Sequence, residues 1–143
     1  MNNFRLLILL LFLTLTPNVY SNEKISSHVN AVELFVAAFN AQDSAAMASF
    51  VTNDIQWLSV DNNQVAVEAK GKSNLIDSMD AYFKSCPTCR SEVTEMISTT
   101  SRVSAVEIAS WHGKSGHTAQ KAISVYEFTD GLISRVYYFP AEK

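Results

Sequence analysis

The apolar residues of this chain recur in two different rhythms, one helical and one extended. In three segments they return every three or four residues, as on one face of an α-helix. These segments are 26–40, with a cap at Ser26 or Ser27; a short one after a cap at Asp43; and one that opens at Gly71 or Ser73 and that Pro87 stops.

Six further segments alternate apolar and polar residues with a period of two, which predicts strands. They are 54–60, 64–70, 90–100, 102–112, 117–128 and 132–139. The turn-forming stretches "DNN", "GKSG" and "TDG" separate neighbouring strands. The order of elements predicts an α+β fold, in which a curved antiparallel sheet, ending in a four-strand meander, is closed over by N-terminal helices.

The first 21 residues have the pattern of a secretory signal peptide. Arg5 precedes an unbroken apolar stretch over 6–15, Pro17 follows it, and Ser21 offers a small residue for cleavage before Asn22. The apolar stretch is shorter than the ~20 residues that span a bilayer. We therefore expect a single domain over 22–143, released into the periplasm or secreted, with no membrane attachment after cleavage.

Composition narrows the range of partners. The 122 residues that follow the signal suit one compact domain, and they contain ten basic and fourteen acidic residues without a basic cluster. Such a mildly acidic surface argues against nucleic acid as a partner. The sequence also lacks a phosphate-binding loop, a nucleophile elbow and a dinucleotide fingerprint, so we expect no cofactor.

Both cysteines lie in "SCPTCR", as Cys86 and Cys89. A redox-active pair needs a helix N-terminus to lower the first thiol's pKa, whereas this motif follows a predicted helix. In an oxidising compartment we expect a disulfide that fixes the turn from helix to strand. A redox role stays open, because Lys84 and Arg90 partly offset the helix dipole.

A zinc site is the other use of these cysteines. His112 and His117 flank "GKSG" and are expected to face each other across a hairpin. The 22 residues between Cys89 and His112 exceed the ~12–15 of the matching zinc pattern, so we predict no metal site.

Three stretches of the chain resemble the nuclear transport factor 2-like superfamily, in particular its SnoaL-like and ketosteroid-isomerase-like group. They are "ELFVAAFNAQDSAAMASFVTNDIQW", "GKSNLIDSMDAYF" and "YEFTDGLISRVYYFP". The resemblance implies a cone of bent sheet, with a pocket between sheet and helices, and often a homodimer built on the outer face of the sheet. It is specific for the fold and weak for function, because this fold hosts many chemistries.

The resemblance also argues against one activity. The tyrosine and the two aspartates of ketosteroid isomerase would fall at Phe35, Ser59 and Ser124. Proton transfer from carbon requires a carboxylate base and an O–H donor for the oxyanion. Phe35 can serve as neither, and two serines of normal acidity cannot replace the carboxylates. We therefore do not expect steroid isomerisation by that mechanism.

The same strand register, with period-two alternation, predicts which side chains line the pocket. We expect apolar and aromatic walls with a few polar groups, the composition of a small-molecule site. The ligand-binding residues predicted in this way are Phe35, Trp57, Ser59, Trp111, Ser124, Tyr126, Tyr137 and Phe139. The alternative is that these aromatic residues simply fill the cone.

Three ionisable residues are candidates for catalysis: Glu107, Arg135 and His28. A carboxyl group between apolar walls can act as an acid or base, but Arg135 is also placed to reach Glu107 across the sheet and form a structural ion pair. Arg135 is alternatively suited to clamp a ligand carboxylate. His28 lies on the same helical stripe as Phe35, either facing the mouth of the cone or exposed at the helix start.

Three functions follow from these residues. The first is an exported protein that binds a small apolar or aromatic molecule, with weak catalysis or none. The second is a SnoaL-like lyase, isomerase or cyclase that uses Glu107, with Arg135, Tyr137 or His28 assisting. The third is a dimeric interaction module whose cone is filled by side chains.

Overall fold

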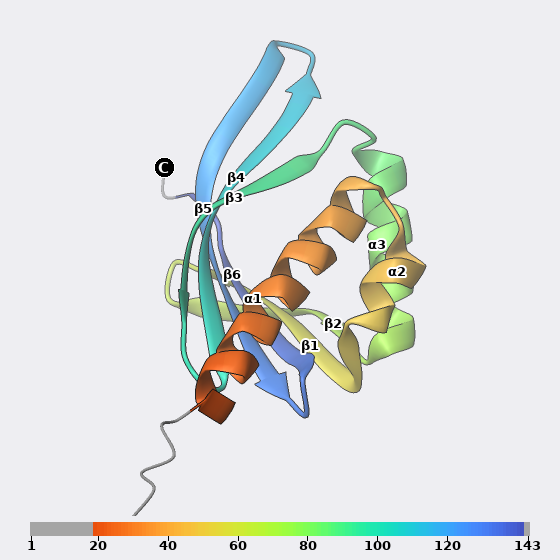
Figure 1. Ribbon diagram of the computed structural model, residues 1–143. Coiled ribbons are helices and arrows are strands. Elements are labelled where there is room, and N and C mark those ends of the chain that lie inside the picture. The colour runs from red at the N-terminus through yellow and green to blue at the C-terminus, as the bar shows by residue number, and fades with distance from the viewer. Residues whose placement is uncertain (1–18, 142–143) are drawn as a thin grey trace, which may run out of the picture.

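The computed structural model describes residues 19–141, which fold into three helices and one curved, open, six-stranded sheet (Figure 1). The helices lie together on one face of the sheet. The α+β fold predicted from the sequence is thus confirmed. The elements are α1 (Val19–Asn40), α2 (Ser44–Ser49), β1 (Val51–Asp61), β2 (Gln64–Lys70), α3 (Lys72–Ser85), β3 (Arg90–Ser98), β4 (Arg102–Gly113), β5 (Gly116–Thr129) and β6 (Leu132–Phe139).

The helices follow the expected spacing, with one difference at the start of α1. This helix begins at Val19, so neither expected serine caps it. Ser27 instead donates from its hydroxyl to the Lys24 carbonyl within the helix, at 2.8 Å. Residues 19–25 can continue the helix toward the N-terminus because none of them is a proline or glycine. The expected cleavage before Asn22 thus falls in its first turn, and it stays a prediction because residues 1–18 lie outside the described residues.

The strand order in the sheet is β2-β1-β6-β5-β4-β3. The last four strands form the predicted antiparallel meander, and β1 joins its end through a parallel pairing with β6. This pairing places β1, which follows the two N-terminal helices, beside the last strand of the chain. Segments that are far apart in the sequence therefore build one continuous wall.

Each of three strands has one extra residue relative to its partner, and these bulges bend the sheet. The pairing skips Glu68 on β2, Thr94 on β3 and Ser134 on β6. After each extra residue, the side chains that face the helices change from odd to even positions or the reverse. The bulge at Ser134 changes the predicted site, as described below.

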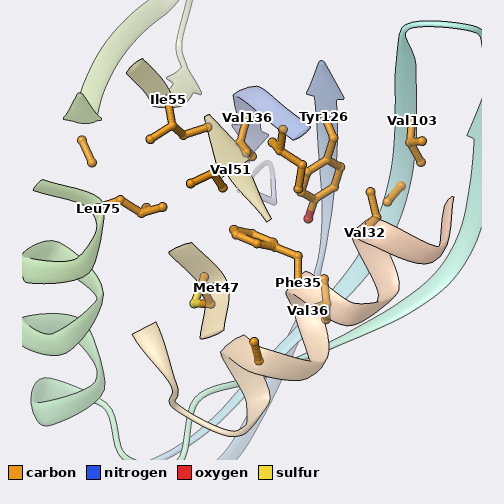
Figure 2. Packing of buried hydrophobic residues seen from close by; sticks show 14 of the residues in the cluster. Val32, Phe35, Val36, Met47, Val51, Ile55, Leu75, Val103, Tyr126 and Val136 are labelled. Atoms are coloured by element: carbon orange, nitrogen blue, oxygen red, sulfur yellow. The ribbon is translucent and has the colours of Figure 1, made fainter. Parts of the chain in front are cut away.

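The core lies between α1 and the inner face of the sheet (Figure 2). Phe35 from α1 and Tyr126 from β5 lie near one another there, with ring centroids 6.1 Å apart in an edge-to-face arrangement. Fully buried aliphatic side chains surround the two rings, namely Val32, Val51, Ile55, Leu75, Val103, Ile133 and Val136. No helix within residues 19–141 is both long and apolar enough to span a membrane.

Candidate functional site

A cavity of about 520 Å³ opens between the inner face of the sheet and helices α1 and α3. Its volume lies in the range of pockets that hold small organic ligands, ~300–1,000 Å³. Most of its wall is aromatic or apolar. The aromatic residues in the wall are Phe35, Phe39, Trp57, Tyr82, Trp111, Tyr126 and Tyr138.

Glu107 on β4 is the buried acid of this cavity, with 6% of its surface exposed. The Tyr126 hydroxyl donates to its Oε1 at 2.7 Å, and the Ser91 hydroxyl donates to its Oε2 at 2.6 Å. One neutral hydroxyl therefore holds each carboxylate oxygen. Ser91 is itself fixed by Asn40 at the end of α1, because the Ser91 N–H donates to Asn40 Oδ1 at 2.8 Å and the Asn40 amide donates back to the Ser91 carbonyl at 2.7 Å.

Two tyrosines near Glu107 have raised pKa values. Burial, and then the negative charge of Glu107, raises the pKa of Tyr126 well above its ordinary value. Burial, followed by the charges of Glu107 and Tyr82, raises the pKa of Tyr138 to about 12. Both phenols are therefore hydrogen-bond donors at neutral pH. The Tyr126 hydroxyl donates its hydrogen bond to Glu107, and Tyr138 also lines the cavity.

Most of the residues predicted to line the pocket do lie in its wall. Glu107 and six of the eight predicted ligand-binding residues are there: Phe35, Trp57, Ser59, Trp111, Ser124 and Tyr126. The cavity is open although these aromatic side chains surround it, so they do not simply fill the cone. Whether they contact a ligand stays a prediction.

The predicted inward positions on β6 were wrong by one residue. Arg135, Tyr137 and Phe139 do not line the cavity, and Val136 and Tyr138 face inward instead. The extra residue at Ser134 is the physical reason, because counting by twos from buried Ile133 fails after the bulge. The adjacent polar pair "SR" between buried Ile133 and Val136 was the sequence signal for this bulge.

As a result, the expected ion pair between Arg135 and Glu107 does not form. The Arg135 guanidinium contacts Glu127 Oε2 at 3.2 Å and donates to Gln56 Oε1 at 3.1 Å. A hydrogen bond to the Tyr137 hydroxyl, together with Glu127, raises the pKa of Arg135. This cluster lies on the outer face of the sheet, so it neither pairs with the cavity's acid nor clamps a ligand inside.

His28 is buried but does not line the cavity. Its ring stacks on Phe128 with centroids 4.0 Å apart, and neither ring nitrogen has a hydrogen-bond partner. Both expectations for this residue were therefore wrong, since it is neither exposed nor in the pocket. The α1 helix begins earlier than expected, which moves His28 away from a fraying end.

Cys86 and Cys89 form a disulfide at the end of α3, with their Cα atoms 5.4 Å apart. Cys89 is buried and forms part of the cavity wall. The disulfide leads directly into β3, where Arg90 donates to the Pro87 and Cys89 carbonyls and Ser91 holds Glu107. Its position at the C-terminal end of a helix is unfavourable for a thiolate, which supports a structural role.

Some residues of the site were not predicted from the sequence. Tyr138 was not among the predicted lining residues, and Ser91 could be matched to Glu107 only once the pairing of β3 with β4 was known. Glu68 enters the wall as the extra residue of the β2 bulge. His112 and His117 do face each other, with ring centroids 5.1 Å apart, but the described residues contain no group of three metal-binding side chains.

Comparisons with a protein-family model and with solved structures agree with the fold described above. Residues 32–136 match the model of the SnoaL-like domain. No curated protein sequence matches. A cystatin-fold protein from Novosphingobium aromaticivorans is similar in structure, with 22% identity, a TM-score of 0.68, and 78% of this chain and 96% of that chain covered.

Two other similar structures carry names that refer to small molecules. TerC, co-crystallised with polyporic acid, has 14% identity and a TM-score of 0.68, with 80% of this chain and 91% of that chain covered. A candidate polyketide cyclase from Xanthomonas campestris pv. campestris has 18% identity and a TM-score of 0.59, with 81% and 91% covered. At these identities the likeness shows the fold alone.

Proposed function

Since the chain belongs to the SnoaL-like domain family, we propose that it binds a small apolar or aromatic molecule in the cavity between its sheet and its helices. One observation carries this proposal: a cavity of about 520 Å³ with aromatic walls contains a single deeply buried carboxylate. Apolar walls that bury a ligand, with few polar groups that orient it, are typical of ligand pockets. TerC, which shares the fold, was co-crystallised with a small molecule.

Filling the cavity tests the proposal. Ala109 lines the cavity, and Ala119 is exposed on the neighbouring strand. We expect Ala109→Phe to abolish binding of small aromatic compounds, measured by native mass spectrometry, while Ala119→Phe leaves binding unchanged. Equal binding by both variants, with the fold retained by circular dichroism, would refute a ligand site in this cavity.

A second candidate function is proton-transfer catalysis, without a cofactor, as in an isomerase, cyclase or dehydratase. The observation that favours it is that Glu107 and the Tyr138 phenol line the same cavity, because a carboxylate can remove a proton and a phenol can stabilise the resulting oxyanion. Arg135, Tyr137 and His28 do not line the cavity and take no part in this version. Glu107→Gln should then abolish turnover while ligand binding remains.

We propose that the protein acts outside the cytoplasm, in the periplasm or as a secreted protein. The signal-like N-terminus and the Cys86–Cys89 disulfide support this location. The intact mass of protein purified from its host tests both points. It should correspond to a chain that begins at Asn22 and lacks two hydrogens.

We also propose that a second copy of the chain covers the outer face of the sheet. Val65, Val67, Ile123 and Phe139 lie on that face with 37–60% of their surfaces exposed, and Ile123 pairs directly with Phe139. Soluble proteins rarely expose a continuous apolar surface without a partner, and two-fold dimers are the commonest assemblies.

A further inference from the structure

The charge of Glu107 has no positive partner among the residues that the structure describes. Both salt bridges in that part of the chain go to Glu127 instead, from Arg102 and Arg135. The contacts of Glu107 are the neutral hydroxyls of Tyr126 and Ser91. Burying a carboxylate raises the free energy of the folded state unless an opposite charge compensates it. A positively charged group bound in this cavity would supply that compensation.

The hydrogen-bonding capacity of the carboxylate is only partly used. Its two oxygens offer about four acceptor positions, and the two hydroxyls occupy one on each oxygen. Glu107 also contributes to the cavity wall. A donor on a ligand can therefore reach an acceptor position without displacing Tyr126 or Ser91.

The walls of the cavity also favour a cation. Trp57 and Trp111 both line it, and Phe35 lies beside Trp57 with ring centroids 6.1 Å apart. The faces of such rings attract ammonium groups, tryptophan most strongly. Several aromatic residues around one site are the usual way in which proteins hold organic cations.

The other charges in the wall do not reverse this preference. Glu68 adds a second carboxylate, and Arg90 is the only cationic side chain among the described lining residues. Arg90 is an exposed residue, and its guanidinium donates to the carbonyls of Pro87 and Cys89, at 3.1 and 2.6 Å. Because those carbonyls hold it at the end of α3, Arg90 does not neutralise Glu107.

We propose that the ligand of this cavity is an organic cation, with an aromatic or apolar body of a size suited to about 520 Å³ and one ammonium group that pairs with Glu107. This inference rests on the proposed binding function and names the chemical class of the ligand. The body lies against the aromatic walls, and the ammonium group donates to the free acceptor positions of the carboxylate.

Three probes of nearly equal shape test the inference: 2-phenylethylamine, 2-phenylethanol and phenylacetate, titrated calorimetrically at pH 7. We expect the amine to bind at least about tenfold more tightly than the alcohol, and the anion to bind most weakly. Glu107→Gln should reduce the preference for the amine to about twofold or less. Glu92→Gln, the control, should keep the preference, because Glu92 is exposed on β3 and does not line the cavity.

Two results would overturn the inference. One is an alcohol that binds as tightly as the amine, and the other is a preference for the amine that survives Glu107→Gln. In either case binding of the alcohol would leave the proposed binding function standing. Failure of all three probes would overturn the inference about the cation, while the binding function itself is decided by the comparison of Ala109→Phe with Ala119→Phe. If Glu107→Gln does not fold, the three probes on the unaltered protein, with phenethyltrimethylammonium as a fourth, still decide: weaker binding of both cations than of the alcohol refutes the proposal.

Discussion

His28 is the residue whose burial has the clearest consequence for stability. Burial, and then the nearby charge of Lys24, lowers the pKa of His28 below its ordinary 6.5. Above that pH the imidazole is neutral in both the folded and the unfolded chain and contributes no pH dependence. As the pH falls through about 6.5, the unfolded chain takes up the proton first, so the free energy of unfolding decreases.

We therefore expect His28→Leu to flatten the pH dependence of stability between pH 7 and pH 5. At pH 7 the variant should also gain roughly 1 kcal/mol, because two buried nitrogens without hydrogen bonds are removed. Urea unfolding at several pH values measures both effects. His117→Leu, at an exposed position, is the control and should keep the original slope; an unchanged slope in His28→Leu would mean that another group causes the pH dependence.

At the scale of elements, the Cys86–Cys89 disulfide joins α3 to β3 and closes a very short ring. Such a ring restricts little of the unfolded chain, so its entropic contribution is at most about 2 kcal/mol. We expect the double variant Cys86→Ser/Cys89→Ser to lose no more than this in urea unfolding, and to fold with the same secondary structure by circular dichroism.

The matching control is the unaltered protein with its disulfide reduced, which should show the same loss. A loss of about 4 kcal/mol or more would mean that the disulfide supports the packing of Cys89 in the cavity wall rather than only the turn.

The secondary-structure elements also show how much of the fold could be predicted from the sequence. Helices and strands were predicted to within a few residues, except at the start of α1, because their apolar spacing is regular. On β6, residues 137–139 are all aromatic, so hydrophobicity could not choose which of them faces inward. The bulge at Ser134 made that choice, and there the Ser134 hydroxyl donates to the Glu127 carbonyl at 3.2 Å on the neighbouring strand.

For the whole molecule, the resemblance to the nuclear transport factor 2-like superfamily is confirmed by the family match and by the similar structures. The superfamily could be recognised from the sequence because the family pattern spans most of the chain. The partners of Glu107 could not be predicted in the same way, since they depend on how β3, β4 and β5 pair across the curved sheet.

The outer face of the sheet gives a prediction at this scale. If a second copy covers it, Ile123→Lys should place a buried charge in the interface and convert dimers to monomers, because unpaired charges are costly to bury. Light scattering coupled to gel filtration measures the mass. Leu34→Lys, which changes an exposed apolar residue on α1, should not alter it; a monomeric mass before any substitution would refute the dimer.

The placement of Trp57 and Trp111 has a practical consequence. They are the only two tryptophans of the chain, and both lie in the wall of the same cavity. When light at 295 nm excites the protein, nearly all of the emission therefore comes from the cavity wall. The emission wavelength and intensity of these two tryptophans therefore report the hydration of the cavity and the entry of a ligand, without any attached dye.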